Sequence, residues 1–189
     1  LLLQQTFQWV MPLLKFKPIN YKYFYLMNDL PVYKILREAS TKWPTNPAVH
    51  DEQGTINFQE LFTEAEKLKA ELIRLGIRSG MGIGMMASNS RQFIIGIFAG
   101  VGTGAAVMPM SPQLKRAEID DILQEAKLHA IIDDRTGTQP LDSIETVIPM
   151  QQGSFRFAFT HVHGSVSFAP FVQQPAFMRF TSGTTGKSK

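Results

Sequence analysis

Apolar side chains recur at helical spacing in the stretch that follows residue 56. One helical face carries these five positions: Leu61, Ala65, Leu68, Leu72 and Leu75. Asn57 and Glu60 have the spacing of a capping box, and Gly76 supplies a C-terminal stop. A shorter amphipathic helix is predicted over residues 31–39, before Pro44. The chain therefore contains two amphipathic helices near its beginning.

Short, continuous apolar runs follow these helices and have the character of buried strands. They cover residues 83–87, 105–109 and 129–133. Helical patterns lie between them, one starting near Arg91 and one carrying Ile119 and Leu123 on its apolar face. Because a connection between parallel strands needs a dozen or more residues, this alternation predicts an α/β fold, with a mostly parallel sheet and helices on both faces.

The hydrophobic pattern weakens after Asp134. Shorter strands are predicted at residues 144–148, 155–159, 166–168 and 176–180. The last of them runs directly into the carboxy-terminal segment, which is rich in glycine, serine and threonine.

Composition narrows the classes of function. The 189 residues are 44% hydrophobic and 19% charged, which is a globular balance. The 19 Lys+Arg and 16 Asp+Glu are scattered, which argues against a nucleic-acid partner. The absence of cysteine excludes disulfides, thiolate zinc sites and a cysteine nucleophile, and it fits a reducing, cytoplasmic location.

Residues 92–114 carry no charge, and Gly96, Gly100 and Gly104 have the spacing of membrane helix pairs. Pro109 and the glycines interrupt this segment. We therefore expect a buried helix followed by a buried strand, with glycines allowing close backbone approach, and no membrane span.

Two other patterns are weak indications of a site. Residues 82–87 and 100–105 satisfy the loose G-x-G-x-x-G/A dinucleotide fingerprint, but the first falls within a predicted strand and the second at a helix end. His161 and His163 would share one strand face, yet no further ligand is visible and an exposed face is favoured over a metal site. No metal site and no catalytic residue is identified.

The carboxy-terminal segment is the strongest chemical signal. Glycines expose backbone N–H groups, hydroxyls donate hydrogen bonds and lysines neutralise negative charge, so the segment suits a polyphosphate. The candidate ATP-phosphate ligands are Thr181, Ser182, Gly183, Thr184, Thr185, Gly186, Lys187 and Lys189. Residues 183–188 also end like a Walker A loop, but that motif needs glycine where Thr181 stands.

Residues 180–189 resemble the phosphate loop of the adenylate-forming (AMP-binding) superfamily: an aromatic residue, then T-S-G-T-T-G, a variable residue, and P-K-G. Ser188 stands where that family usually has proline. Residues 80–90 are similar to its early strand and Asn-Ser turn, although Met81 replaces the usual aspartate. Residues 99–109 are similar to its Ala-x-x-x-x-Gly-Ala-x-x-x-Pro stretch.

This resemblance, closest to acyl-CoA synthetases and fatty-acid–CoA ligases, implies a function. It implies ATP-dependent activation of a small-molecule carboxylic acid to an acyl-adenylate, followed by transfer to coenzyme A. ATP, Mg²⁺ and coenzyme A are the implied cofactors. The loop would hold the β- and γ-phosphates, with Lys189 as the family's loop lysine.

The resemblance and the hydrophobic pattern together suggest how the chain is divided. Residues 27–189 are interpreted as a partial AMP-binding domain, equivalent to the amino-terminal portion of the family's large domain and ending at the phosphate loop. Residues 1–26 are interpreted as an upstream extension, because the periodic, capped pattern begins only near residue 27. In the family, the adenine and acyl contacts follow this loop, so the 189-residue chain alone is expected to be inactive. A non-catalytic nucleotide-binding module and a Walker-type NTPase remain alternatives, and the oligomeric state is not predicted.

Overall fold

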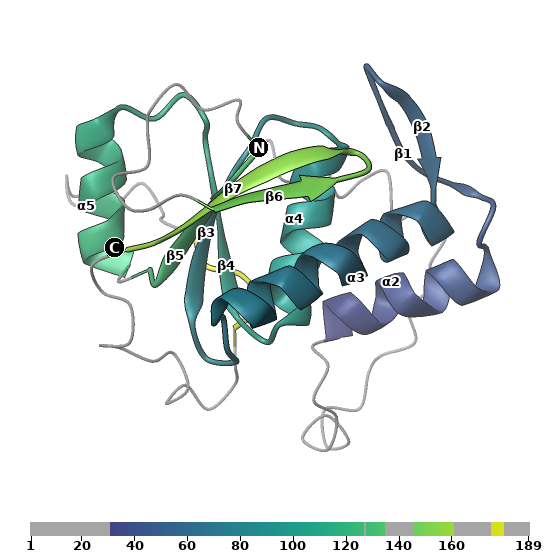
Figure 1. The fold of residues 1–189 in the computed structure, drawn as a ribbon, viewed down its shortest axis with the longest axis horizontal. Helices are drawn as coiled ribbons and strands as arrows, with labels where there is room; N and C mark the ends of the chain where they lie inside the picture. The colour runs from purple at the N-terminus through teal and green to yellow at the C-terminus, as the bar shows by residue number, and fades with distance from the viewer. Residues whose placement is uncertain (1–30, 127, 135–145, 161–174, 180–189) are drawn as a thin grey trace.

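The structure is a computed structural model that describes residues 31–126, 128–134, 146–160 and 175–179 (Figure 1). The elements, in chain order, are α2 (Pro31–Lys42), β1 (Pro47–Asp51), β2 (Gly54–Asn57), α3 (Phe58–Leu75), β3 (Gly82–Met86), α4 (Arg91–Gly102), β4 (Ala106–Met110), α5 (Arg116–Ala126), β5 (Ala130–Asp133), β6 (Thr146–Met150) and β7 (Gly153–Phe159). The extension at residues 1–26, the strand at 166–168, His161 and His163 lie outside the described residues and stay predictions.

The main sheet has the strand order β4-β3-β5-β7-β6. β3 pairs in parallel with both β4 and β5, as the alternation of strands and helices predicted. β7 pairs antiparallel with β5 and with β6. The α/β fold class is confirmed, and a hairpin made of β6 and β7 extends the parallel part of the sheet.

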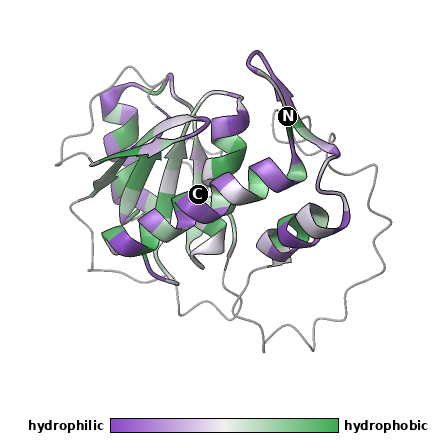
Figure 2. Ribbon diagram, turned by 45° about the vertical axis from the view of Figure 1, so that its right-hand side comes forward, coloured by the Kyte–Doolittle hydropathy of each residue, from purple (hydrophilic) through white to green (hydrophobic). Residues whose placement is uncertain are grey.

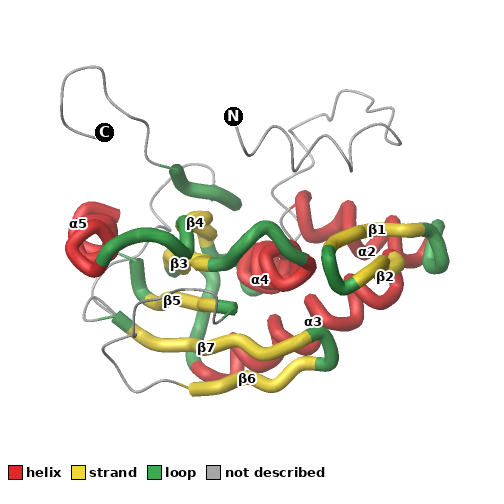
Figure 3. Tube along the Cα trace, turned by 90° about the horizontal axis from the view of Figure 1, so that it is seen from above, coloured by secondary structure: helices red, strands yellow, loops and turns green. Residues whose placement is uncertain are grey.

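Helices cover both faces of this sheet (Figure 3). α5 lies on one face, whereas α3 and α4 lie on the other, with α2 outside them. Successive side chains of the strands point alternately into two hydrophobic cores, one on each face of the sheet. Ile83 and Val107 lie in the core beneath α3 and α4, while Met86 and Met108 lie in the core beneath α5. Figure 2 shows the apolar residues on the inner surfaces of these layers.

α3 begins and ends as its sequence predicts. The Asn57 side chain accepts from the Glu60 N–H at 2.9 Å, and the Asn57 N–H donates to the Glu60 carboxylate at 2.8 Å. Gly76 ends the helix with φ +113°, a backbone region that favours glycine. Leu61, Leu68 and Leu72 are buried on the face toward the sheet.

Glycines let α4 lie close to the sheet. A Cβ atom on Gly96 would be 2.5 Å from Met85 Sδ, and one on Gly100 would be 2.7 Å from Val107 Cγ2. The buried helix and the buried strand expected from residues 92–114 are thus confirmed. Among the described residues, no helix combines the length and the apolar character that crossing a bilayer requires.

A second, two-stranded sheet formed by β1 and β2 was not anticipated from the sequence. It stands apart from the main sheet, beside the beginning of α3 (Figure 1). Ile56 is its only fully buried hydrophobic residue, so the hairpin lacks the alternating pattern that would have revealed it.

Candidate functional site

The chain enters the expected phosphate loop from the edge of the main sheet. Phe177 forms a parallel bridge with Val107 of β4. The Val107 N–H donates to Ala176 O, and the Met178 N–H donates to Val107 O, both at 2.9 Å. The predicted strand at residues 176–180 is thus found as a single bridge within the described residues. Thr181 to Lys189 lie outside those residues, and their role stays a prediction.

Connectivity identifies the edge of the sheet where a ligand is expected. β3 continues into α4 on one face, while neighbouring β4 continues into α5 on the opposite face. In open α/β sheets, ligands bind outside the carboxyl ends of the strands at such a switch point. Because residues 176–178 run parallel to β4, they also lead toward this edge.

Residues 88–90 form the turn at the carboxyl end of β3. The Ser90 side chain caps α4 by accepting from the Phe93 N–H at 3.3 Å, and its hydroxyl donates to Ser88 O at 3.1 Å. The Ser88 N–H donates to Asp134 Oδ2 at 3.3 Å. Because Asp134 directly follows β5, this hydrogen bond ties the turn to the carboxyl end of β5.

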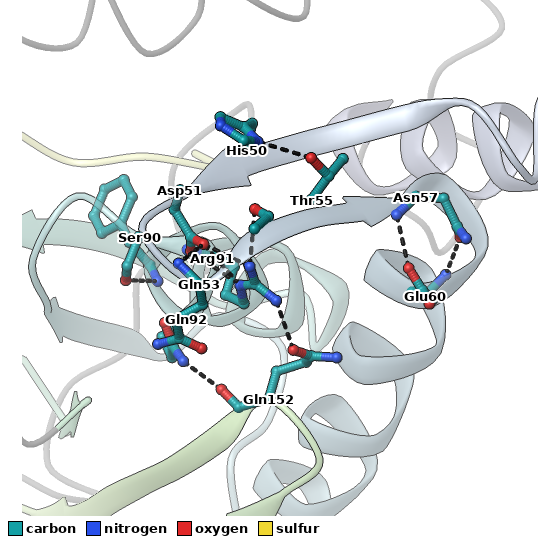
Figure 4. Close-up of polar contacts among 12 residues, drawn as sticks. His50, Asp51, Gln53, Thr55, Asn57, Glu60, Ser90, Arg91, Gln92 and Gln152 are labelled. Carbon is teal, nitrogen blue, oxygen red and sulfur yellow. Dashed lines mark hydrogen bonds and ion pairs between the residues drawn. The ribbon is translucent and has the colours of Figure 1, made fainter.

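A buried ion pair holds the other side of this turn (Figure 4). Asp51, at the end of β1, contacts Arg91 Nη2 at 2.5 Å and accepts from the Arg91 backbone N–H at 2.9 Å. The Arg91 and Asp51 side chains are 5% and 10% exposed. Hydrogen bonds from Arg91 lower the pKa of the Asp51 carboxyl from 3.8 to about 2, although burial opposes this shift.

The same ion pair occupies the amino end of α4, where a dinucleotide fingerprint would need to bind pyrophosphate. Asp51 already accepts from the first N–H of that helix. Residues 82–87 lie mainly in β3, and residues 100–105 lie around the carboxyl end of α4. Both placements confirm that neither glycine pattern is a Rossmann turn.

The β6–β7 turn is bound to the same cluster. Arg91 Nη1 donates to Gln152 Oε1 at 2.8 Å, and the Gln92 side-chain amide donates to Gln152 O. The Glu64 carboxylate, which is buried at 2% exposure, accepts the backbone N–H groups of Gln151 and Gln152 at 3.1 and 3.3 Å. We call Asp51, Glu64, Arg91, Gln92 and Gln152 the polar clamp.

A second buried ion pair lies at the carboxyl end of β5. Arg156 Nη2 is 2.6 Å from Asp133 Oδ2, and the Asp133 side chain is fully buried. Neither this pair nor the polar clamp was predicted from the sequence, because the residues that contact one another in them lie 23 to 88 positions apart along the chain. The described residues contain no group of three or more His, Cys, Asp or Glu side chains arranged for a metal ion.

Comparison with known proteins identifies the family. The family described as AMP-binding enzyme matches residues 36–189, so the chain belongs to this family of adenylate-forming enzymes. Members of this family use ATP and Mg²⁺. The match runs through the candidate phosphate loop to Lys189.

Two relatives and one solved structure illustrate the likeness. Tyrocidine synthase 3 of Brevibacillus parabrevis is 27% identical over 163 residues, which are 85% of this chain. Nonribosomal peptide synthetase 8 of Aspergillus fumigatus is 25% identical over 162 residues, which are 84%. The chain spans only 2% of the length of either relative.

The solved structure is the N-terminal subdomain of Klebsiella oxytoca NpsA in complex with 3-hydroxyanthranilyl-AMSN. It aligns with a TM-score of 0.60 and 21% identity, over 83% of this chain and 38% of that one. At this identity the likeness shows the fold, which is that of the amino-terminal part of an adenylate-forming enzyme.

Proposed function

We propose that this chain supplies the ATP-phosphate loop of an enzyme that activates a carboxylic acid as its acyl-adenylate. The observation that carries the proposal is the order of the chain. A segment paired with β4 runs toward the carboxyl edge of the sheet and is followed at once by T-S-G-T-T-G-K-S-K. Membership of the AMP-binding family supports the same assignment and favours it over a Walker-type NTPase.

The loop residues have an electrostatic role in this proposal. The hydroxyls of Thr181, Ser182, Thr184 and Thr185, the backbone N–H groups of Gly183 and Gly186, and the ammonium groups of Lys187 and Lys189 would hold the β- and γ-phosphates of ATP. Mg²⁺ would neutralise part of the phosphate charge when bound. The acid's carboxylate oxygen then forms a bond to the α-phosphorus as pyrophosphate leaves with the electron pair of the broken P–O bond.

A thiol is the proposed acceptor of the acyl group. Coenzyme A is the acceptor implied by the resemblance of the loop and upstream residues to acyl-CoA synthetases. A second candidate is an amino-acid substrate passed to the thiol of a carrier protein, because a relative is by name a nonribosomal peptide synthetase. The two candidates share the adenylate-forming step.

Nucleotide binding by loop variants tests the proposal. We expect Lys189→Ala to weaken binding of Mg·ATP to the 189-residue chain by about 10- to 100-fold, because a hydrogen bond to a charged group contributes about 1.5–3 kcal/mol. Calorimetric titration measures this change. Lys34→Ala, which removes an exposed charge on α2, is the matched control and should bind like the unsubstituted chain.

Two results decide between the alternatives. Equal affinity of the Lys189→Ala and Lys34→Ala variants would contradict a phosphate-binding role for the loop. Loss of Mg·ATP binding in the first variant, without acid-dependent ATP–pyrophosphate exchange in any longer form of the protein that includes this chain, would favour a non-catalytic nucleotide-binding module.

A further inference from the structure

We propose that Met86, Met108 and Met110 form an oxidation-sensitive site, which is exposed when α5 detaches locally from the sheet and which reacts reversibly with a peroxide. We call these three residues the methionine cluster. The inference is independent of the proposed function, because it concerns the face of the sheet that α5 covers. The chain contains nine methionines and no cysteine, so methionine is its only sulfur side chain. Methionine sulfur is a common target of oxidants in proteins.

The methionine cluster lies on the β3–β4 part of the sheet. Met86 of β3 is the direct partner of Met110 of β4 in the parallel ladder, and Met108 lies two residues before Met110 on the same face. All three side chains are buried in the core beneath α5, with Met86 at 0% exposure. A peroxide therefore reaches their sulfur atoms when this part of the fold opens.

α5, which covers the cluster, has a small buried surface. Ile119 and Leu123 are its buried residues. The helix spans 11 residues, and an isolated helix shorter than about 12–15 residues is only marginally stable in water. The ion pair between Arg116 and Asp120, at 3.0 Å, lies within the helix and does not attach it to the sheet. The stability of α5 therefore depends on its contact with the apolar face beneath it.

α4, on the opposite face, provides the contrast (Figure 3). It buries residues along most of its length, among them Ile95 and Ile97. The polar clamp attaches its first two residues, Arg91 and Gln92, to Gln152 of the β6–β7 turn. Segments with few buried apolar contacts open locally at a lower free energy than the rest of a fold. We therefore expect α5 to open more often than α4.

Met85 is an internal reference for this difference. It precedes Met86 in β3 and is equally buried, at 0% exposure, but it lies in the core of the opposite face. Its sulfur lies against Gly96 of α4, where an added Cβ atom would be 2.5 Å away. Opening of α5 exposes Met86 and leaves Met85 covered, whereas unfolding of the whole chain exposes both.

Oxidation converts each methionine of the cluster into its sulfoxide. The thioether sulfur loses two electrons and gains one oxygen atom, the O–O bond of hydrogen peroxide breaks, and water leaves. The sulfoxide is polar, so burying it in an apolar core without a hydrogen-bond partner is unfavourable. Oxidation therefore keeps α5 away from the sheet, and reduction by methionine sulfoxide reductases acting on both epimers allows it to return.

Release of α5 also affects a neighbouring segment. Met178 packs against the same core as the methionine cluster, and its N–H donates to Val107 O of β4 at 2.9 Å. Loss of the α5 contacts removes part of the packing that holds this segment on the edge of the sheet. The cluster thus links the oxidation state of three methionines to the packing of two separate elements.

Peroxide labelling of the 189-residue chain tests the proposal. The folded chain is treated with hydrogen peroxide for increasing times, and fragment-ion mass spectrometry measures the sulfoxide at each methionine. We expect Met86, Met108 and Met110 to react at least about tenfold faster than Met85, because α5 opens at a lower free energy than α4. Hydrogen exchange should then be faster at the α5 amides of the oxidised chain and unchanged in α4, and the reductases should restore the original rates.

Two matched substitutions separate opening of α5 from general destabilisation. Ala117→Gly weakens α5 and Ala70→Gly weakens α3, and both alanine side chains are exposed. Ala117→Gly should speed oxidation of Met86 about threefold, because glycine lowers helix stability, while the rate at Met85 stays the same. Ala70→Gly should not raise the ratio of Met86 to Met85 oxidation.

Each other outcome overturns a stated part of the proposal. Equal oxidation rates at Met85 and Met86, or no reaction at either before the chain unfolds, would overturn the local opening of α5. Preferential oxidation of Met86 without faster exchange of the α5 amides would overturn the effect of the sulfoxides on α5. A similar rise of the Met86 to Met85 ratio in Ala117→Gly and Ala70→Gly would show that the opening is not confined to α5. No nucleotide is used, so these results are independent of the test of the proposed function.

Discussion

At the scale of single residues, the Asp51–Arg91 ion pair makes the stability of the fold depend on pH in the acidic range. The pKa of the Asp51 carboxyl is lowered to about 2 from an ordinary 3.8, chiefly by hydrogen bonds from Arg91. A carboxyl with a lowered pKa in the folded state stabilises that state above its unfolded pKa, and this contribution is lost as pH falls through the folded pKa. The window of loss therefore runs from about pH 4 to about pH 2.

We expect this contribution to disappear in Asp51→Asn, which cannot ionise. A pKa lowering of this size corresponds to about 2 kcal/mol. Urea unfolding at several pH values should show that the difference in free energy of unfolding between the unsubstituted chain and Asp51→Asn shrinks by about that amount between pH 4 and pH 2. A constant difference across this range would mean that Asp51 does not depend on Arg91 in the way the contacts indicate.

At the scale of elements, α4 packs on the sheet through glycines whose neighbours differ in stiffness. A methyl group at Gly100 would meet the β-branched Val107, whereas one at Gly96 would meet the flexible end of Met85. Alanine favours a helix over glycine by about 1 kcal/mol at either position. The steric fit of the added methyl group therefore decides how far the two substitutions differ in their effect on stability.

Gly100→Ala should accordingly destabilise the fold by about 1–3 kcal/mol, the usual cost of overpacking a core, while Gly96→Ala should be nearly neutral. Urea unfolding measures both changes. In Gly100→Ala combined with Val107→Ala, the total loss should be smaller than the sum of the two single losses, since the second change makes room for the added methyl group. Equal effects of the two glycine substitutions would show that α4 can shift as a unit.

The sequence predicts those elements whose pattern lies within one continuous segment, and it does not predict contacts between distant segments. α3 and β3 were recognised because their periodicity and caps lie within one continuous segment. The β1–β2 hairpin was missed because most of its residues are only partly buried, which leaves no alternation of apolar and polar positions. Asp51 and Arg91 are 40 residues apart, so a single sequence holds no signal that they meet. The phosphate-loop motif, by contrast, is continuous and was visible as a candidate site directly.

At the scale of the whole molecule, the polar clamp joins three parts that are distant in sequence: the β1–β2 hairpin, the helical layer and the β6–β7 turn. Arg91 contacts Asp51 on one side and Gln152 on the other. A buried charge is stabilised by its polar partners. Loss of the contact with Asp51 or with Gln152 therefore changes how much the remaining contact stabilises the Arg91 guanidinium. Asp51 and Gln152 should therefore be energetically coupled, although no hydrogen bond between their side chains is found within the described residues.

A double-mutant cycle measures that coupling. In Asp51→Asn combined with Gln152→Ala, the change in free energy of unfolding should differ from the sum of the single changes by about 0.5–2 kcal/mol, because both substitutions act on Arg91. Gly100→Ala is the control partner, since nine residues of helix, about 14 Å, separate Gly100 from Arg91. Its combination with Asp51→Asn should be additive within about 0.5 kcal/mol. Additivity in both cycles would show that Arg91 contacts the hairpin and the β6–β7 turn independently and that the clamp does not act as one unit.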